Sequence, residues 1–217
     1  MKELLKDVKV FEVDYGPTQE YKKKRVREVL NGLPNNVVFV PIDFTKQTLA
    51  DVLKGAGLAR NRETFFIWEG VTYYIPEEAV RGTLRYIAGS APGSAVELDF
   101  RSQSYIDWVK ANIDSPERVP AAARRILIAQ RQFREWGEPM IFGFPDRKEK
   151  EFLASEGLEV IEMLHCASPE ARQRYLTRRD GTIAFPISPP NGDWPSSAQT
   201  MVEAATRGPR SARGARA

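Results

Sequence analysis

Apolar and polar positions follow two periodicities that take turns along most of the chain. Short runs of β-branched and aromatic residues bounded by turn residues predict strands, and apolar positions spaced for one helical face predict amphipathic helices. The predicted strands are 8–13, 37–42, 64–68, 95–100 and 158–165, and the predicted helices are 18–30, 47–53, 76–87, 120–136 and 146–156. Because strands alternate with helices, the pattern predicts an α/β fold with a mostly parallel sheet and helices on both of its faces.

The C-terminal part departs from this alternation. Segment 182–187 follows the turn residues Asp180 and Gly181, and it predicts a strand that pairs antiparallel with 158–165 at the sheet edge. Beyond residue 187, prolines, glycines and serines replace the large apolar residues, which is typical of disordered chain. This stretch carries four arginines against two acidic residues. We therefore expect a folded domain over residues 1–187 and a disordered basic tail over residues 188–217.

Composition narrows the classes of protein to which the chain can belong. Its 217 residues suit one or two domains, and 32 basic against 29 acidic residues leave a net charge of +3. Because acids and bases are interspersed, we expect no nucleic-acid partner. No apolar run approaches the roughly 20 residues that cross a bilayer, and the first residues lack the apolar stretch of a secretory signal. We expect a cytoplasmic protein without a membrane partner.

Cys166 is the single cysteine of the chain and His165 is the single histidine. One cysteine cannot form an internal disulfide, and one cysteine beside one histidine does not make a zinc site. His165 next to Cys166 lies on a predicted strand, where ordinary packing is the simpler interpretation. We therefore expect no metal.

Acidic residues follow three successive predicted strands. They are Asp14, Asp43 and Glu69, and in an open parallel sheet ligands bind outside the carboxyl ends of the strands. At one shared edge these carboxylates would accept hydrogen bonds from ribose hydroxyls, an adenine amino group or an ammonium group. The alternative is that each acid only caps the next helix or ends a turn. The residues alone leave both interpretations open.

Motifs that would indicate another chemistry are absent. The sequence contains no G-x-G-x-x-G, G-x-x-x-x-G-K-[ST], G-x-S-x-G or H-E-x-x-H. Gly55 and Gly57 follow a predicted helix rather than a strand, so they are interpreted as a helix stop. Trp68, Tyr73 and Tyr74 flank the third acid, and they either line a pocket or belong to the core.

Several segments together carry a family resemblance. They are Phe11-Glu12-Val13-Asp14 with Pro17, Gln19 and Lys22, then Asp43-Phe44, then 66–77 (FIWEGVTYYIPE), and in the C-terminal part 137–143, Gly157-Leu158 and 175–181. This set resembles the leucine carboxyl methyltransferase-like family of S-adenosylmethionine-dependent enzymes, particularly its bacterial branch. The likeness runs over most of residues 8–186, and 66–77 is its most specific part.

The resemblance implies a class I methyltransferase, which is a Rossmann-like α/β fold, with S-adenosyl-L-methionine as the cofactor. By this likeness Asp14 would hold the ribose hydroxyls, Asp43 and Phe44 would bind the adenine end, and Glu69 would lie near the methionine part. Tyr73 and Tyr74 are candidates for the substrate pocket. The likeness identifies no catalytic residue.

The chain departs from the family pattern at its start. A dinucleotide-type layout puts the ribose acid about 20 residues after the first glycine of the cofactor loop, so that loop would precede Met1. We therefore expect an N-terminally truncated member that lacks the first strand and the glycine-rich loop. Segments 8–13 and 64–68 would then lose their shared neighbour, and direct pairing, a homodimer or poor stability are the expected consequences.

The expected function is O-methyl transfer from S-adenosyl-L-methionine, impaired by the missing part of the cofactor site. The acceptor would be a carboxylate, or a phenol or polyketide hydroxyl, of a small molecule or a protein. A carboxylic acid with a pKa of about 4 is already ionised at neutral pH, whereas an aliphatic hydroxyl needs a base. The sequence gives no sign that His165 reaches the strand ends, so it favours an acceptor that ionises easily.

Two other functions are alternatives to methyl transfer. The first is that of a non-catalytic remnant that binds a nucleotide, or that binds a partner chain through open sheet edges. A nicotinamide-dependent dehydrogenase is disfavoured, because the glycine fingerprint of that site is absent.

Overall fold

The computed structural model describes residues 7–165, 168–182 and 200–206. The described residues form two compact units that divide between Arg62 and Glu63. Each unit contains its own sheet, of two strands in the first and four in the second. No helix in the described ranges is long and apolar enough to cross a membrane.

The first unit is built on two parallel strands. In chain order its elements are β1 (Val10–Asp14), α2 (Gly16–Leu30), β2 (Val37–Pro41) and α3 (Leu49–Gly55). Helix α2 has Pro17 in its first turn, where a missing backbone N–H costs nothing. Helix α3 begins after Thr48, whose side-chain oxygen accepts a hydrogen bond from the backbone N–H of Asp51. All four elements lie close to the ranges that the periodicity predicts.

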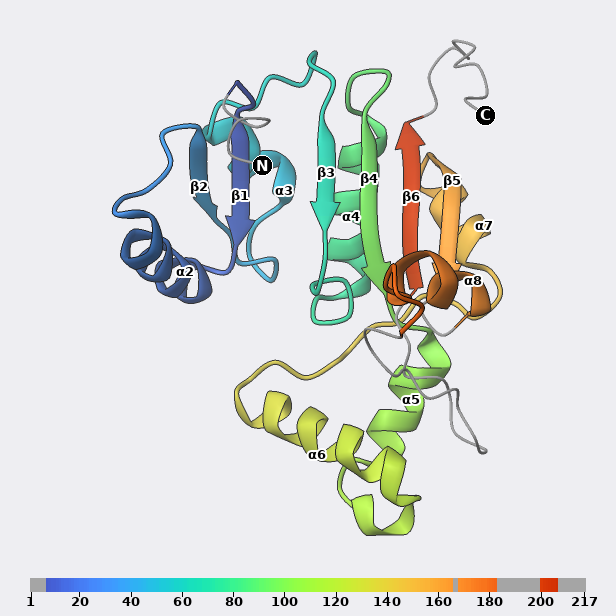
Figure 1. The fold of residues 1–217 in the computed structure, drawn as a ribbon. Coiled ribbons are helices and arrows are strands. Elements are labelled where there is room, and N and C mark those ends of the chain that lie inside the picture. The colour runs from blue at the N-terminus through green and yellow to red at the C-terminus, as the bar shows by residue number, and fades with distance from the viewer. Residues whose placement is uncertain (1–6, 166–167, 183–199, 207–217) are drawn as a thin grey trace. The chain divides into compact units, whose positions relative to one another are not determined.

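The second unit is built on a mixed sheet with the order β3-β4-β6-β5 (Figure 1). Its strands are β3 (Phe65–Trp68), β4 (Ala95–Phe100), β5 (Leu158–His165) and β6 (Thr200–Thr206). Strand β4 pairs parallel with β3, whereas β6 is antiparallel to both of its neighbours. Strands β3, β4 and β5 therefore all point the same way, and their carboxyl ends share one edge.

Helices surround this sheet and extend beyond its carboxyl edge. They are α4 (Glu77–Ala88), α5 (Gln103–Asn112), α6 (Ala121–Glu135) and α7 (Glu149–Ser155), with short helical segments at Pro116–Arg118 (η1), Pro169–Ala171 (α8) and Arg172–Leu176 (η2). Figure 1 shows α5 and α6 past the carboxyl ends of β3 and β4. These two helices form the part of the unit that reaches furthest from the sheet over this edge.

The core of the second unit lies between the sheet and α4. Val96 and Leu98 of β4 and Val80 and Leu84 of α4 have no solvent exposure. The loop that follows α6 adds Phe144, whose ring stacks on that of Phe100 with 4.3 Å between the centroids. Burial of this apolar surface supplies the main driving force for folding the unit.

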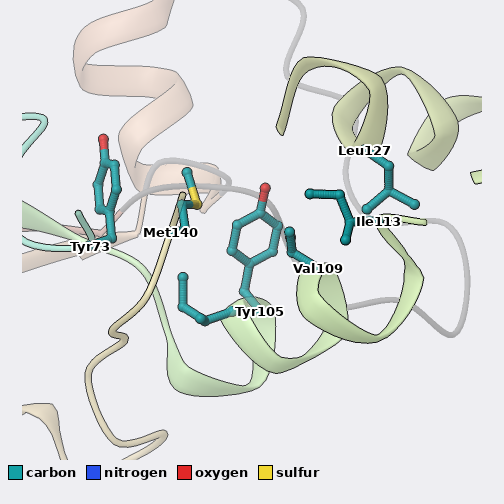
Figure 2. Close-up of a cluster of buried hydrophobic side chains, with 7 residues drawn as sticks. Tyr73, Tyr105, Val109, Ile113, Leu127 and Met140 are labelled. Atoms are coloured by element: carbon teal, nitrogen blue, oxygen red, sulfur yellow. The ribbon is translucent and has the colours of Figure 1, made fainter. Parts of the chain in front are cut away.

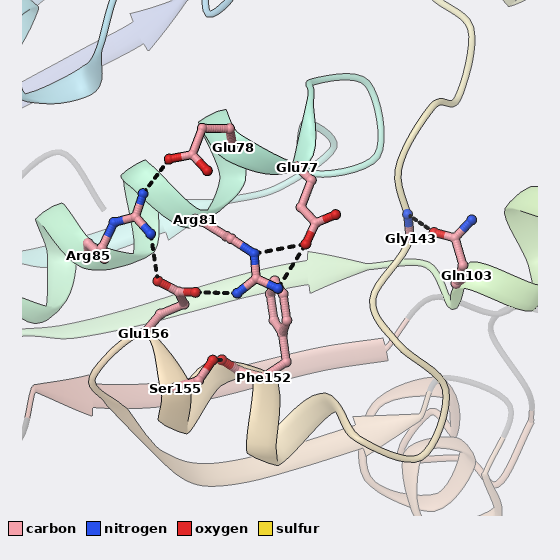
Figure 3. A network of polar contacts seen from close by, with 9 residues as sticks. All are labelled: Glu77, Glu78, Arg81, Arg85, Gln103, Gly143, Phe152, Ser155 and Glu156. Carbon is pink, nitrogen blue, oxygen red and sulfur yellow. Dashed lines mark hydrogen bonds and ion pairs between the residues drawn. The ribbon is translucent and has the colours of Figure 1, made fainter.

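A buried carboxylate joins α4 to the end of α7. Glu156 is 8% exposed and pairs with both Arg81 and Arg85 of α4 (Figure 3). The guanidinium of Arg81 also lies over the ring of Phe152 in α7, at 4.3 Å from its centroid. Charge, hydrogen bonds and aromatic contact therefore act together where α7 packs on α4.

One prediction about the C-terminal part needs correction. Residues 200–206 were expected to be disordered, but they form strand β6 in the middle of the four-stranded sheet, with Val202 and Ala204 fully or almost fully buried. Strand β6 is an antiparallel partner of β5. Of segment 182–187, which was predicted for that place, Thr182 is not part of a strand and 183–187 lie outside the described residues, as does the domain boundary predicted at residue 187.

Candidate functional site

Asp14 and Asp43 lie next to each other at the carboxyl edge of the first unit's sheet. Asp14 is the last residue of β1 and faces Pro41, the last residue of β2, in the parallel register. The backbone N–H of Ile42 donates to the carbonyl oxygen of Asp14 at 2.9 Å. Asp43 follows directly. The predicted meeting of these two acids is therefore a feature of the fold, because parallel pairing in this register puts both strand ends side by side.

The carboxylate of Asp14 is bound by its own unit and remains one-quarter exposed. One oxygen accepts from the backbone N–H of Tyr15 at 2.8 Å, and the other accepts from Lys22 Nζ at 2.9 Å. Lys22 also pairs with Glu12. Partial burial lowers the pKa of Lys22, but its bonds to the two acids outweigh burial and raise that pKa overall.

The carboxylate of Asp43 closes a turn. Its Oδ1 accepts from the backbone N–H of Thr45 at 3.0 Å and from the Thr45 hydroxyl at 2.6 Å, and its Oδ2 pairs with Lys46 Nζ at 2.8 Å. The bond to Lys46, followed by those to Thr45, lowers the pKa of Asp43 to about 2. Asp43 thus makes the turn contacts that the alternative interpretation predicts, and it keeps 27% of its side-chain surface exposed. Phe44 beside it is half-buried.

Glu69 belongs to the second unit and lies at the carboxyl end of β3, on an exposed position. Its loop is tied to the end of β4 through Asp99, which is 2% exposed. Asp99 Oδ1 accepts from the backbone N–H of Gly70 at 2.7 Å, and the Thr72 hydroxyl donates to the Asp99 carbonyl at 2.8 Å. Asp99 therefore fixes the segment that carries Glu69. Sequence analysis missed this residue, although its place inside the predicted strand AVELDF was a signal for it.

Tyr73 and Tyr74 lie where the β3 loop meets the helices beyond the sheet edge. Tyr73 is 6% exposed and belongs to a buried cluster with α5 and α6, completed by Tyr105, Ile106, Val109, Ile113, Leu127 and Met140 (Figure 2). Tyr74 packs against this cluster, with 4.7 Å between the two tyrosine ring centroids. Burial raises the pKa of Tyr74. Both tyrosines take part in core packing, and their contact with a substrate stays a prediction.

Arg101 is a second residue that sequence analysis missed at this edge. It directly follows β4, and its guanidinium carbon lies 5.7 Å from the ring centroid of Tyr73 and 5.3 Å from that of Tyr105. Its backbone carbonyl accepts from the N–H of Phe144 at 2.8 Å. No short motif marks such a residue, because the ring of Tyr73 comes from a distant part of the chain and only Tyr105 is a near neighbour in the sequence.

His165 lies at the strand-end edge, a position that sequence analysis did not anticipate. It is the last residue of β5 and faces Thr200 of β6, and Thr200 faces Phe100 at the end of β4. Two strand spacings, roughly 10 Å, separate the positions of His165 and Phe100. Its neighbour Cys166 lies outside the described residues.

Two further observations concern a glycine cofactor loop and a metal site among the described residues. Gly55 ends α3 and Gly57 follows its C-cap with a φ of +81°, so these glycines stop a helix as predicted. The described histidine, aspartate and glutamate side chains contain no cluster of three or more arranged to hold a metal ion.

A cavity of about 400 Å³ lies on one side of the second unit's sheet. Glu97, Glu203 and Glu162 stand opposite one another on β4, β6 and β5 and line it together with Tyr175 of η2. Arg174 pairs with Glu162. None of the acids or tyrosines predicted from the sequence lines this cavity, so it is separate from the candidate site.

Comparison of the sequence with known proteins agrees with the predicted family. Residues 2–88 match the model of the leucine carboxyl methyltransferase family. A relative from Bacillus subtilis (strain 168), the candidate S-adenosyl-L-methionine-dependent methyltransferase YktD, is 29% identical over 185 residues. That alignment covers 84% of this chain and 56% of the relative, so the chain spans little more than half the length of the protein it matches.

Comparison of the fold with solved structures gives the same class. The structure of PKMT2 from Rickettsia typhi has a TM-score of 0.53 at 8% identity. The alignment covers 95% of this chain and 45% of the PKMT2 chain. PKMT2 has also been solved in complex with AdoHcy, and that structure has a TM-score of 0.51. A candidate methyltransferase from Thermobifida fusca YX gives 0.54 at 15% identity, over 95% of this chain and 66% of its own. The fold is the Rossmann-like class I methyltransferase fold.

Proposed function

We propose that this chain is a member of the leucine carboxyl methyltransferase-like family and the cofactor-binding part of an S-adenosyl-L-methionine-dependent O-methyltransferase. The observation that carries the proposal is the juxtaposition of Asp14 and Asp43 at one sheet edge, joined by the hydrogen bond from Ile42 to the Asp14 carbonyl. Ligands of open α/β sheets bind at such an edge.

The proposed roles follow from the chemistry of these side chains. An ionised carboxylate only accepts hydrogen bonds, and the two hydroxyls of a ribose are a matching pair of donors for Asp14. Asp43 and Phe44 offer an acceptor and an aromatic surface for the adenine end. Glu69 is a negative charge suited to the cationic methionine part. The sulfonium is the methyl donor, so these residues bind and orient it and do not react with it.

The acceptor in this proposal is a carboxylate, or a phenol or polyketide hydroxyl, on a small molecule or a protein. A carboxylate needs no base at neutral pH, whereas an aliphatic hydroxyl does. A base at this edge of the second unit's sheet could come from His165, which lies at the carboxyl end of β5. Strand β5 is two strands away from β4. This distance favours an acceptor that ionises without help. We expect the reaction to occur in the cytoplasm.

We further propose that the 217 residues alone transfer methyl groups weakly. The sequence contains no G-x-G-x-x-G fingerprint, and such a loop supplies backbone N–H groups and a close approach to the cofactor that carboxylates do not replace. Binding would then rest on the acidic strand ends. The expected result is measurable cofactor affinity with little turnover.

Calorimetric titration of the full chain with S-adenosylmethionine and S-adenosylhomocysteine tests the proposal. We expect saturable binding that Asp14→Asn and Glu69→Gln each weaken by about tenfold or more, because each substitution removes a charge-assisted contact. Glu28→Gln is the matched control. Glu28 is an exposed acid of α2 that pairs with Arg25, and its loss should leave both affinities unchanged.

Two results would count against the cofactor role. One is the absence of heat with both ligands at any concentration up to the millimolar range. The other is an equal effect of Asp14→Asn and Glu28→Gln on the affinity, since the ligand would then bind somewhere other than the strand end that carries Asp14.

The second candidate function is a non-catalytic remnant that binds a partner chain. The supporting observation is that, within the described ranges, β1 pairs with β2 alone and β3 pairs with β4 alone, so each presents one edge without a strand partner. Such edges are templates for pairing with another strand. Light scattering coupled to gel filtration would detect a homodimer. A dimer without cofactor binding favours this candidate over the first.

A further inference from the structure

The guanidinium of Arg101, a half-buried residue, has two buried donors without hydrogen-bond partners. Its Nε and Nη1 atoms are shielded from solvent and have no hydrogen-bond partner, and among the described side chains no others are left in this state. No acidic side chain in the described ranges forms an ion pair with it. The ring centroids of Tyr73 and Tyr105 lie 5.7 and 5.3 Å from the guanidinium carbon, and these rings give the cation its favourable contacts.

Aromatic faces satisfy the charge of an arginine only in part. They attract the cation but accept none of its N–H groups in the plane of the guanidinium, where its five donors point. A buried donor without an acceptor lowers stability by the cost of removing it from water. A residue with this cost in a well-packed region is a candidate for function. Proteins often give up stability at functional sites, where a bound ligand completes the missing hydrogen bonds.

The position of Arg101 says where such a ligand would sit. The residue directly follows β4, at the carboxyl edge of the sheet. The neighbouring β3 loop, which carries Glu69, is fixed to the same strand end by the bond from Gly70 to Asp99. Helices α5 and α6 lie beyond this edge (Figure 1). The guanidinium thus lies between the end of the sheet and the helices that extend past it.

We propose that Arg101 binds an anionic group of the methyl acceptor, a carboxylate in particular, and thereby orients that acceptor at the end of β4. A carboxylate has two oxygens that accept from more than one guanidinium nitrogen, which suits two unpaired donors on different nitrogens. The buried rings of Tyr73 and Tyr105 hold the guanidinium in place through their contacts with it. The identity of the bound group as part of the acceptor rests on the proposed function.

Titration of the full chain with benzoate and with benzyl alcohol measures this preference without turnover. The two probes share a ring and differ in charge. We expect the wild type to bind benzoate at least about tenfold more tightly than benzyl alcohol, and Arg101→Met to lose that preference. Arg101→Lys should keep part of it through its remaining charge. Arg118→Met is the matched control, since Arg118 is an exposed arginine with 80% of its side chain accessible.

Thermal unfolding separates a binding role from a structural one. Methionine keeps the apolar stem and removes the unpaired donors, so Arg101→Met should melt at the same temperature as the wild type or up to about 4 °C higher. Benzoate should raise the melting temperature of the wild type and not of this variant. A purely structural arginine would give a lower melting temperature, and that result overturns the proposal, as does a benzoate preference that survives in Arg101→Met.

S-adenosylhomocysteine titrated into the same variants keeps this inference distinct from the proposed function. Unchanged affinity for it in Arg101→Met, with benzoate preference lost, is the result expected if both hold. If no variant binds S-adenosylhomocysteine but benzoate still requires Arg101, the anion site stands and the methyltransferase proposal fails. If S-adenosylhomocysteine binds and benzoate ignores Arg101, the anion site fails alone.

Discussion

Lys22 Nζ donates to Asp14 Oδ2 at 2.9 Å and so joins helix α2 to the end of β1. The pair is open to solvent, with 45% of the Lys22 side chain and 25% of the Asp14 side chain exposed. Exposed ion pairs contribute little, because water screens them and two side chains must be held in place. The ammonium can therefore give way to another donor on Asp14, such as a ribose hydroxyl, at small cost.

Replacement of Lys22 by Gln tests this weakness. We expect the free energy of unfolding to change by less than about 1 kcal/mol, and the affinity for S-adenosylhomocysteine to change far less than it does in Asp14→Asn. Urea denaturation and calorimetry on the three proteins give both quantities. A large loss of stability in Lys22→Gln would mean that the ion pair is a structural clamp, and the carboxylate would then not be available to a ligand.

The buried carboxylate of Glu156 should behave in the opposite way. It is shared by Arg81 and Arg85, so its neutralisation in Glu156→Gln leaves two cations without their common partner (Figure 3). The side chain of Glu156 is 6% exposed, but the arginines are 29% and 50% exposed and regain some water. We expect a loss of about 1–3 kcal/mol in the free energy of unfolding, below the value for a fully buried pair.

Glu78 provides the control for that measurement. It pairs with the same Arg85 at 2.6 Å, but its side chain is 81% exposed. Glu78→Gln should therefore change stability by less than about 0.5 kcal/mol in the same urea denaturation. Equal effects of the two substitutions would show that burial does not set the strength of this network.

Gly143 is required by a close approach of two backbones. A Cβ atom at this position would lie 2.6 Å from the Cα of Gln103 and 2.6 Å from the carbonyl oxygen of Ser102. The Gly143 N–H also donates to Gln103 Oε1 at 2.9 Å (Figure 3). Because backbone rather than a flexible side chain must move, we expect Gly143→Ala to lower the free energy of unfolding by about 1–3 kcal/mol or more.

The same substitution in α4 should have the opposite sign. Gly82 lies on the exposed side of that helix with no atom within 4 Å of its would-be Cβ, so Gly82→Ala gains helix propensity of up to about 1 kcal/mol. Thermal melts of the two alanine variants against the wild type compare them directly. A melting temperature for Gly143→Ala at or above that of the wild type would contradict the close approach.

Local patterns were sufficient to predict most of the elements and the meeting of Asp14 with Asp43. Strand β3 and helix α4 were predictable because an apolar run and a helical period identify them without help from distant residues. The two acids were predictable because parallel strands bring their carboxyl ends to one edge. These features depend on short-range periodicity and on a general rule of sheet topology.

Features that depend on distant contacts were not predictable. Strand β6 is a short run with several small residues in a part of the sequence rich in prolines and glycines, and its Val202 and Ala204 are buried because β4 and β5 flank them. Arg101 lies close to Tyr105 in the sequence, but its contact with Tyr73 joins it to a distant part of the chain. Tertiary context overrides local propensity in such segments.

The contribution of Asp43 to stability should depend on pH. The bonds from Lys46 and Thr45 stabilise the charged form, so the pKa of Asp43 falls from 3.8 to about 2. A carboxyl group with a depressed folded-state pKa contributes stability that is present above the unfolded pKa and is lost as pH falls through the folded value. The contribution of Asp43 should thus be complete at pH 5 and disappear towards about pH 2.

NMR titration of the Asp43 side-chain carbon measures this pKa directly. The midpoint should be about 2 in the wild type, and Lys46→Gln should move it upward because the bond from Lys46 is lost. Lys54→Gln, which removes a lysine of α3 not paired with Asp43, should leave the midpoint in place. A wild-type midpoint near 3.8 would mean that the turn does not hold the carboxylate in solution.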